Sequence, residues 1–498
     1  MDFSPLYFIE NVSVQSLLFG LVILLVMRWF MALPKSNYNL PPGPRALPII
    51  GNLLQVLSIT EFYSMLKELK KQYGDIFKLK IGPYNYVFVC KTETILEGLV
   101  KKGQHLNGRS SLYVLDKVFQ NKGIAFSSGK QWKDQRKFTM SALRDLGVGK
   151  KVLEEKISLE TQRLGEAFQS QNGKPFSLNK QLSLFTSSII YNIIFGKRIK
   201  YSDSEFVEIV EHFHDVFKYI SVFVPENFFP FLRFFRWNSP IEKVIRKQEK
   251  VRSYVKYKII EHKETFNAEN IRDFIDMYLL TLEKEPNSET LTDENLFHTI
   301  CDLFLAGTDT TASHLTWAFV CMAKYTDVQE KCREEIVQIT NGTRPVTMED
   351  KPHMTYVAAT LFEVHRIGTI ASVTAPHTAE VQTTLQGYDI PKGTLVSFLL
   401  LEAHSDPNHW DKPEEFRPER WIDENNELKK NEAFLPFGSG PRMCSGMSLA
   451  NMEAFLAFTN ILQKFQLERP DETPMTLEGN LSGLVYAPTN DDIRAIPL

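Results

Sequence analysis

The chain has 498 residues, of which 43% are hydrophobic and 23% are charged, a balance typical of globular proteins and unlike that of disordered or fibrous chains. The 57 Lys and Arg residues nearly cancel the 60 Asp and Glu residues, leaving a formal net charge of −3. Because no strongly basic arm is present, the composition argues against a nucleic acid as partner. At roughly 150 residues per domain, the length allows about three domains or one large one.

The first predicted element is a membrane helix. In residues 12–33 the only charged residue is Arg28, and a helix of about 20 apolar residues is long enough to cross a bilayer. Asp2 and Glu10 precede this stretch and basic residues follow it, which is the reverse of a cleaved secretory signal and places the N-terminus in the lumen. We therefore expect residues 1–33 to be an N-terminal membrane anchor. A buried core helix is the alternative.

The next segment, residues 34–51, is rich in proline and includes the run Pro41-Pro42-Gly43-Pro44. Proline cannot continue a helix and stiffens an extended chain, so this segment is predicted to be a hinge. Residues 52–498 contain no repeat, low-complexity run or long polar linker and are predicted to form one domain. Helical periodicity dominates it, which predicts a mainly α fold with a small β part. The predicted helices are Glu61–Tyr73, Val152–Gln169, Leu182–Ile194, Phe206–Tyr219, Pro240–Thr265, Asp293–Tyr325, Val328–Ile339, Tyr356–Ile367 and Leu449–Phe465, and the predicted strands are Ile76–Ile81, Tyr86–Cys90, Glu380–Leu385 and Leu395–Leu400.

The cysteines are odd in number, widely scattered and without a Cys-x-x-Cys pair. This pattern argues against a disulfide framework and a structural zinc site, and it suits a reducing compartment. The five residues are Cys90, Cys301, Cys321, Cys332 and Cys444.

Cys444 lies in the sequence Phe437-Gly438-Ser439-Gly440-Pro441-Arg442-Met443-Cys444-Ser445-Gly446. Two glycines and a proline predict a tight loop, and the apolar spacing that follows predicts a helix beginning beside the cysteine. The free N–H groups at a helix N-terminus favour a thiolate, which serves either as a nucleophile or as a metal ligand. The sequence offers no histidine signature of a catalytic thiol and no third glycine of a dinucleotide motif.

The pattern Phe437-x-x-Gly440-x-Arg442-x-Cys444-x-Gly446 resembles in full the haem-binding loop of the cytochrome P-450 family. The resemblance covers essentially the whole chain, and the layout is similar to animal microsomal members that oxidise xenobiotics and lipids. It implies the single-domain cytochrome P-450 fold, haem b (iron protoporphyrin IX) as cofactor, and Cys444 as the thiolate ligand of its iron. Phe437, Arg442 and Gly446 are then cofactor-binding residues.

A long predicted helix contains the segment Ala306-Gly307-Thr308-Asp309-Thr310-Thr311. Glycine and threonine are poor helix formers, so one interpretation is a turn between two helices; apolar spacing on both sides favours a single distorted helix. By resemblance this segment lies over the haem, and Ala306 contacts the cofactor. Asp309 and Thr310 match the family's acid–alcohol pair, which guides protons to dioxygen, and they are the predicted catalytic residues.

Three further residues are assigned to the haem by resemblance. Trp132 and Arg136 lie four residues apart on one side of a predicted amphipathic helix, and in the family this pair contacts the haem propionates. Arg and Trp N–H groups suit these carboxylates because they form charge-assisted hydrogen bonds. His377 matches another propionate contact, with a surface histidine as the equal alternative.

Glu363 and Arg366 lie three residues apart on one helical face, and Pro418-Glu419-Arg420-Trp421 resembles the family's second arginine element. The resemblance implies that Glu363, Arg366 and Arg420 form a buried network behind the cysteine loop. Its predicted role is stability and haem incorporation rather than chemistry.

The resemblance implies a membrane-anchored monooxygenase of the endoplasmic reticulum, with its catalytic domain on the cytosolic side. Its substrate would be a lipophilic small molecule (a xenobiotic, fatty acid or steroid-like compound) that it hydroxylates or epoxidises. No flavin or nicotinamide fingerprint is present, so electrons are expected to come from another protein. The resemblance implies that this donor is an NADPH-dependent flavoprotein reductase, with cytochrome b5 as a further candidate partner. The rival hypotheses are a haem-thiolate isomerase or dehydratase that acts on peroxides without a reductase, and a haem sensor or carrier. The Asp309-Thr310 pair argues against the isomerase or dehydratase.

Basic residues between positions 130 and 151 provide a candidate docking face for an acidic partner protein. The alternative is that they are scattered solvated charges. The six residues are Lys130, Lys133, Lys137, Arg144, Lys150 and Lys151.

Overall fold

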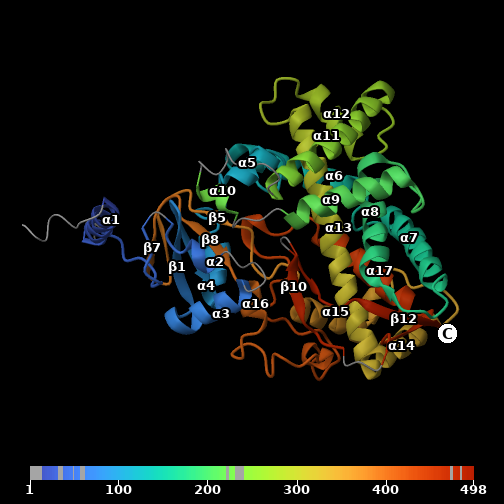
Figure 1. Cartoon of the computed structure of the whole chain (residues 1–498). Coiled ribbons are helices and arrows are strands. Elements are labelled where there is room, and N and C mark those ends of the chain that lie inside the picture. Colours follow the sequence, from blue (N-terminus) through green and yellow to red (C-terminus); the bar gives the residue numbers. More distant parts are fainter. Residues whose placement is uncertain are drawn as a thin grey trace, which may run out of the picture.

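The computed structural model describes residues 14–31, 37–48, 50–56, 62–219, 224–229, 240–471, 475–482 and 485–498. Helices dominate this part of the chain and the strands form small sheets (Figure 1), which confirms the predicted mainly α fold with a small β part. The α-helices are α1 (Val14–Met31), α2 (Leu53–Val56), α3 (Phe62–Tyr73), α4 (Thr92–Leu96), α5 (Tyr113–Phe119), α6 (Gly129–Asp145), α7 (Lys151–Gln169), α8 (Leu178–Phe195), α9 (Ser204–Tyr219), α10 (Pro225–Phe228), α11 (Pro240–Thr265), α12 (Phe274–Lys284), α13 (Asp293–Lys324), α14 (Thr326–Thr340), α15 (Thr355–Gly368), α16 (Leu400–His404) and α17 (Met447–Leu462).

The described strands are β1 (Ile76–Ile81), β2 (Tyr84–Val89), β3 (Gly108–Arg109), β4 (Phe176–Ser177), β5 (His377–Thr378), β6 (Thr383–Leu385), β7 (Tyr388–Ile390), β8 (Leu395–Phe398), β9 (Phe465–Glu468), β10 (Gly479–Ser482), β11 (Val485–Pro488) and β12 (Asp492–Pro497). The largest sheet has the order β1-β2-β8-β5-β3 and lies on the side of the molecule away from α7 and α8 (Figure 1). Strands β2 and β8 run parallel in it, and its other neighbours are antiparallel. The smaller sheets are β4-β12-β9, β6-β7 and β10-β11.

Helix α13 is one unbroken α-helix that runs through the helical part of the molecule (Figure 1), so the single-helix interpretation is confirmed and the turn between two helices is wrong. Thr292 caps its N-terminus, because its side chain accepts a hydrogen bond from the backbone N–H of Asn295. Thr308 and Thr310 each donate their hydroxyl hydrogen to the carbonyl oxygen four residues back. These bonds satisfy the hydroxyls inside the helix, which is how the threonine-rich segment stays helical.

Gly307 lets α8 pack closely against α13. A Cβ atom at this position would lie 2.7 Å from the side chain of Ile190 on α8. Next to it, Thr186 of α8 donates its hydroxyl to the carbonyl oxygen of Thr308 at 3.0 Å. A glycine inside a helix costs roughly 0.5–1 kcal/mol relative to alanine, and here that cost is offset by close packing of two core helices.

The long periodic elements begin and end near the predicted residues. Strand β1 and helix α11 have the predicted bounds. Helix α17 ends at Leu462 rather than at Phe465, because Phe465 pairs with Pro497 as the first residue of β9. Helices α5 and α12 lie where no element was predicted.

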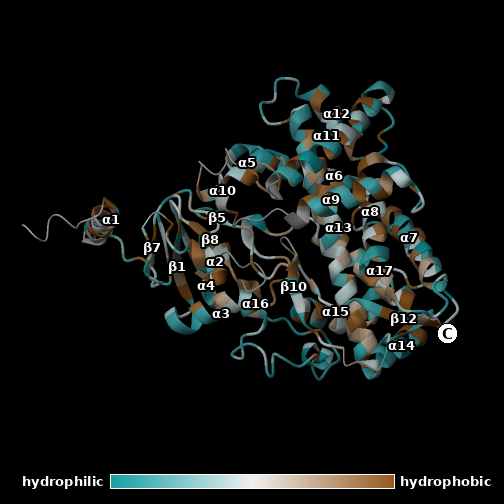
Figure 2. Ribbon diagram, viewed as in Figure 1, coloured by the Kyte–Doolittle hydropathy of each residue, from teal (hydrophilic) through white to brown (hydrophobic). Residues whose placement is uncertain are grey.

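Helix α1 is set off from the other elements in Figure 1, and Figure 2 shows mostly hydrophobic residues along it. Its apolar side chains are exposed, with Leu17 at 63% and Leu24 at 64%. Within the described residues, no helix combines the length and the apolar character that a membrane span requires. Residues 1–13 and 32–33 of the predicted anchor lie outside the described part of the chain.

The predicted contacts among Glu363, Arg366 and Arg420 are confirmed, and the three side chains form a buried network. Both carboxylate oxygens of Glu363 accept hydrogen bonds from Arg366, at 2.8 and 2.9 Å, and Oε1 also accepts one from Arg420 at 3.0 Å. The indole N–H of Trp421 donates to Oε2 at 2.8 Å. The three charged side chains are at most 6% exposed. Each buried charge therefore faces a partner of opposite sign, and removing one partner would leave an uncompensated charge.

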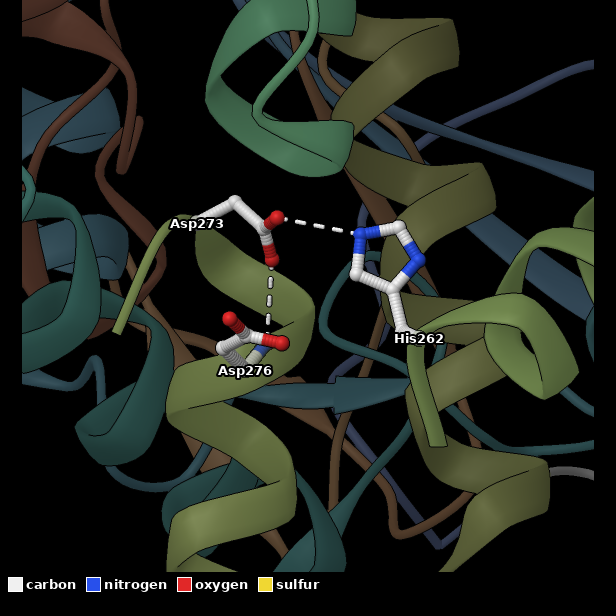
Figure 3. A group of neighbouring side chains, drawn as sticks. All are labelled: His262, Asp273 and Asp276. Atoms are coloured by element: carbon white, nitrogen blue, oxygen red, sulfur yellow. Dashed lines mark hydrogen bonds and ion pairs between the residues drawn. The ribbon is translucent and has the colours of Figure 1, made fainter. Parts of the chain in front are cut away.

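A second satisfied cluster joins α11 to α12, and its His262, Asp273 and Asp276 side chains lie close enough to hold a metal ion (Figure 3). Nε2 of His262 lies 3.0 Å from Oδ2 of Asp273, whose Oδ1 accepts the backbone N–H of Asp276 and caps α12. Arg272 donates to both carboxylate oxygens of Asp276, at 2.6 and 2.8 Å. We call this cluster of His262, Arg272, Asp273 and Asp276 the α11–α12 clasp. Because its carboxylate oxygens already have partners and a guanidinium lies beside them, we assign it to helix packing.

Candidate functional site

The cysteine loop folds as a tight turn that depends on glycine at two positions. Gly438 and Gly440 have φ angles of +68° and +71°, in the left-handed region that favours glycine. A Cβ atom at Gly440 would lie 1.8 Å from the carbonyl oxygen of Leu99. The backbone N–H of Cys444 donates to the carbonyl oxygen of Phe437 at 3.0 Å. The loop predicted from sequence is therefore rigid and closed on itself.

Cys444 is exposed, and helix α17 begins three residues after it, with Gly446 as its N-cap. Although solvent reaches Cys444, the surrounding protein desolvates its thiol and raises the pKa. The N–H groups of Gly446 and Met447 and the charge of Arg136 act in the opposite direction but do not outweigh burial. The helix N-terminus thus favours the thiolate, as expected, but burial acts more strongly on the thiol. A metal ion bound at the sulfur would favour the thiolate further.

Arg442, two residues before Cys444, joins the loop to the body of the domain. Its Nε and Nη2 atoms donate to the carbonyl oxygens of Asn107 and Ser127, at 2.8 and 2.6 Å. Its guanidinium lies 4.0 Å from the centroid of the Trp132 ring, a cation–π contact. None of these partners carries a negative charge.

Two more arginines lie in the same region and have partners of the same kind. Arg136 donates to the carbonyl oxygen of Met443 at 2.6 Å, and Arg109 donates to that of Ala125 at 3.1 Å. Among the residues that the structure describes, no carboxylate forms an ion pair with Arg109, Arg136 or Arg442, which we call the arginine cluster. Burial, together with the charges of Arg109 and Arg136, lowers the pKa of Arg442 to about 8. Burial lowers the pKa of Arg109 to about 10.

The arginine cluster fits an anionic ligand, because uncompensated cations in a desolvated region are unfavourable until opposite charge arrives. The indole N–H of Trp132 is also buried, and it has no hydrogen-bond partner among the described residues. A ligand that accepts hydrogen bonds would satisfy it. Haem b offers propionate carboxylates for these donors and an iron for the sulfur of Cys444. The residues present therefore fit this cofactor.

His377 is buried in strand β5, so the surface-histidine alternative is wrong. Its Nδ1 atom lies 2.7 Å from the carbonyl oxygen of Leu106, and the strand register places it opposite Arg109. Burial and the charges of Arg109 and Arg442 hold the pKa of His377 well below its usual range. The ring is therefore neutral beside the arginine cluster, and its contact with a propionate stays a prediction.

Helix α13 carries the predicted catalytic segment. Ala306 is exposed and Thr310 is half-buried, although most of this helix is buried. The hydroxyl of Thr310 donates to the carbonyl oxygen of Ala306. Asp309 is buried, and its Oδ1 lies 3.2 Å from Nδ1 of His214 on α9. The acid and the alcohol are thus neighbours in sequence with different hydrogen-bond partners.

Asp302 connects α13 to the arginine cluster, and the sequence patterns did not single it out. Its Oδ2 accepts the backbone N–H groups of Ile124 and Ala125, at 2.6 and 3.0 Å. Carbonyl oxygens of the same segment accept hydrogen bonds from Arg442 and Arg109. Burial raises the pKa of Asp302 to about 7, against the effect of the two N–H groups. The sequence signal that would have indicated Asp302 is a single acidic residue among the apolar residues of a predicted helix.

The structure divides the predicted site residues into two groups. Residues of the first group are linked by direct contacts around the cysteine loop. Those of the second lie on α13, and Asp302 of this helix binds the segment 123–128, which in turn contacts Arg442 of the loop. The first group comprises Trp132, Arg136, Phe437, Arg442, Cys444 and Gly446, with His377 opposite Arg109; the second comprises Ala306, Asp309 and Thr310.

The other cysteines are free thiols of a different character. Cys90, Cys321 and Cys332 are buried, and burial raises the pKa of each, to about 12 for Cys332. Cys301 is half-buried, and its pKa is also raised by burial. All five cysteines lie in the described part of the chain as free thiols, and Cys444 is the exposed one among them.

The fold and the site together define a haem-thiolate protein: a mainly α domain in which one exposed cysteine, in a loop shaped by two glycines, lies near arginines that have no acidic partner in the described part of the chain. Comparison with known proteins agrees with this class. Residues 41–494 match the family Cytochrome P450, and the chain belongs to that family.

The chain is similar to Cytochrome P450 2B2 from Rattus norvegicus, at 37% identity over 455 residues, or 91% of this chain and 92% of the relative. It is also similar to Cytochrome P450 2B4 from Oryctolagus cuniculus (36% over 482 residues, 95% and 96%) and to Cytochrome P450 2J2 from Homo sapiens (34% over 488 residues, 97% and 96%). The protein is accordingly a cytochrome P450 monooxygenase. It uses haem b and draws its electrons indirectly from NADPH.

Proposed function

We propose that the protein hydroxylates or epoxidises a lipophilic small molecule, such as a xenobiotic, a fatty acid or a steroid-like compound, with electrons that a separate flavoprotein reductase delivers from NADPH. Cytochrome b5 is a second candidate donor. The observation that carries the proposal is the combination of exposed Cys444 with the arginine cluster, because a thiolate-ligated haem requires both a sulfur ligand and donors for its carboxylates.

Cys444 is the proposed ligand of the haem iron. Phe437 and Gly446 hold the loop on either side of it, one by accepting the Cys444 N–H and the other by capping α17. Ala306 presents the exposed position of α13 to the cofactor. Haem bound through a thiolate supplies the chemistry of dioxygen activation.

Arg442, Trp132, Arg136 and His377 are the proposed partners of the propionates. The two arginines supply charge-assisted donors, and the unpartnered indole N–H of Trp132 supplies another. His377 is neutral beside them and adds a ring nitrogen without adding to the repulsion within the arginine cluster.

Asp309 and Thr310 hold and move protons in this proposal. Reducing O2 to one water and one inserted oxygen atom consumes two protons per turnover, and a buried site needs side chains to supply them. The hydroxyl of Thr310 can leave the carbonyl of Ala306 for another partner, because a hydroxyl both donates and accepts. A protein that rearranges peroxides has no such need for protons, so the pair favours the monooxygenase over the isomerase or dehydratase.

Residues 1–33 are the proposed anchor in the endoplasmic reticulum membrane, with 34–51 as hinge and 52–498 as the catalytic domain on the cytosolic side. The exposed apolar side chains of α1 support an apolar environment around it, because such a surface is unfavourable in water. Full-length protein is expected to resist alkaline carbonate extraction from microsomes, and a variant lacking residues 1–33 to be released. Extraction of the full-length chain would contradict the anchor.

The basic residues between 130 and 151 are the proposed docking face for the reductase, with scattered solvated charges as the alternative. All six are exposed, as a docking surface requires. Replacing Lys133 and Lys137 with Glu is expected to weaken reductase-dependent turnover most at low ionic strength, because salt screens such contacts. An unchanged salt dependence would favour scattered charges.

The central test reconstitutes the full chain, haem and reductase in lipid vesicles with NADPH, O2 and a panel of lipophilic compounds. NADPH-dependent O2 consumption with formation of an oxygenated product is expected. Conversion of organic hydroperoxides without NADPH-dependent product would favour the isomerase or dehydratase instead. Haem binding without either activity would favour a sensor or carrier.

The ligand assignment has its own test. Cys444→Ala is expected to abolish the red-shifted Soret band that a haem-thiolate protein gives in its reduced carbon monoxide complex. Cys301→Ala is the matched control, because this half-buried thiol lies outside the cysteine loop, and the band should remain. A band retained in Cys444→Ala would overturn the assignment.

A further inference from the structure

Asp309 of α13 is joined to α9 by a hydrogen bond to His214. Nδ1 of His214 lies 3.2 Å from Oδ1 of Asp309. The Asp309 side chain is 11% exposed, whereas that of His214 is 42% exposed. The imidazole is therefore more accessible than the buried carboxylate that it contacts. Histidine is also the side chain whose ordinary protonation change falls near neutral pH.

Several charged groups of α9 and of the elements packed against it form ion pairs that do not involve His214. The pairs between α9 and α11 are Lys247 with Asp215 and Lys250 with Glu208, and within α9 Glu208 also pairs with His212. Helix α8 has one charged residue, Lys180, in its first turn. On α9 itself, Glu211 is exposed. From α13, the carboxylate that meets His214 is Asp309.

We propose that His214 is the positioning residue through which Asp309 takes protons from solvent; this rests on the role proposed above for Asp309. The protonated imidazole passes its Nδ1 proton to Oδ1 of Asp309, which leaves a neutral ring and a neutral carboxylic acid. The ring then takes a proton from water, and the carboxylic acid gives its own to the next acceptor in the site. Two such transfers per turnover match the two electrons and one O2 that a monooxygenase consumes.

The relay depends on how α9 packs against α13. Phe213, next to His214, stacks on Phe304 of α13 with ring centroids 4.3 Å apart. This apolar contact holds the imidazole beside the carboxylate. A displacement of α9 would separate His214 from Asp309, so the position of this helix sets how efficiently electrons are converted into product.

The first test compares His214→Gln with His212→Gln in the haem-loaded, reductase-reconstituted full chain. Glutamine keeps a hydrogen-bond donor near Asp309 but cannot carry a proton through a titrating ring. We expect product formed per NADPH consumed to fall by about fivefold in His214→Gln, with the difference going to hydrogen peroxide, and its dependence on pH between 6 and 8 to disappear. His212→Gln removes the histidine two residues before His214 on α9. It should leave both the product formed per NADPH and its pH dependence unchanged.

The second test needs no turnover. Hydrogen exchange at the C2 position of each histidine ring, followed by mass spectrometry, reports the pH midpoint at which that ring titrates. Because a nearby carboxylate favours the protonated ring, the midpoint for His214 is expected to fall by about one pH unit in Asp309→Asn. The midpoint for His212 should not move.

The outcomes separate this proposal from the proposed function. Wild-type coupling in His214→Gln, with reduced coupling in Asp309→Asn, overturns the role of His214 and leaves that of Asp309 intact. Wild-type coupling in both variants overturns both roles. An unshifted His214 midpoint in Asp309→Asn shows that the contact does not form in solution and also overturns the proposal.

Discussion

Two regions of this molecule hold arginines away from bulk solvent, and they differ in what faces the charge. Behind the cysteine loop, Arg366 and Arg420 meet the carboxylate of Glu363. At the loop itself, Arg442 and the rest of the arginine cluster meet carbonyl oxygens and an aromatic face. A charge removed from water without a partner carries a penalty of several kcal/mol. The chain itself supplies the negative charge for Arg366 and Arg420, which makes them part of a structural network. The arginine cluster depends on a ligand for its negative charge, which makes it a binding site.

The α11–α12 clasp belongs with the first kind, although its composition would suit a metal. His262 and Arg272 supply the positive partners, and the oxygens of Asp273 and Asp276 are already used. Satisfaction of the hydrogen-bonding groups, rather than the presence of charged residues, therefore distinguishes the two kinds of region. The four predictions that follow test this comparison.

Glu363→Gln should have the largest effect on the fold, because it leaves the buried charges of Arg366 and Arg420 without a carboxylate. The free energy of unfolding is expected to fall by about 3–5 kcal/mol, measured by denaturant titration of the haem-loaded chain. Glu419→Gln is the control: that side chain is 46% exposed and its pair with Lys331 is worth under about 1 kcal/mol. Equal losses in the two variants would contradict the distinction.

Arg442→Met should affect haem more than the fold. Its lost hydrogen bonds to carbonyl oxygens are offset by relief of repulsion from Arg109 and Arg136, so we expect the haem-free chain to lose about 1 kcal/mol of stability. Haem transfer to excess apomyoglobin should accelerate by at least about tenfold, because a charge-assisted bond of about 1.5–3 kcal/mol is lost. The exposed Arg144→Met is the matched control, and a transfer rate equal to it would rule out the propionate role.

Trp132→Phe should have a smaller effect of the same kind. The ring that Arg442 covers is kept, and only the buried N–H without a partner is removed. Stability of the haem-free chain should change by less than about 0.5 kcal/mol, while haem transfer accelerates by about fivefold, as expected for one hydrogen bond of about 1 kcal/mol. If stability falls and transfer does not change, Trp132 is a core residue rather than a ligand donor.

His262→Gln should have the smallest effect of the four variants, and this effect should depend on pH. Burial acts to lower the pKa of His262, but the hydrogen bond and charge of Asp273 outweigh it, so the pKa is raised. The stabilisation is therefore fully present below the ordinary value of about 6.5 and is lost as pH rises through the raised pKa. In paired denaturant titrations, the free energy of unfolding of the wild type should exceed that of His262→Gln by about 1 kcal/mol at pH 6 and by less at pH 9. A constant difference would show that the pair is not ionised.

Parts of the molecule whose partners lie close along the chain were predictable. The loop at Cys444 follows from its glycines and proline, and the continuity of α13 follows from apolar spacing on both sides of residues 306–311. Glu363 and Arg366 lie within one helical turn, so their pairing follows from helix geometry. The resemblance to a known family added Arg420, which the spacing alone does not connect to them.

The sequence by itself therefore determined the helices, the rigid loop and the cysteine that a haem iron would bind. Only the tertiary structure decided that Asp302 holds residues 124 and 125, that Arg109 joins the arginine cluster, and that His214 meets Asp309. Asp302 binds an N–H group 178 positions away, and His214 lies 95 positions from Asp309. Hydrogen bonds and ion pairs act over a few ångströms in space and are indifferent to separation along the chain, so no local pattern records them.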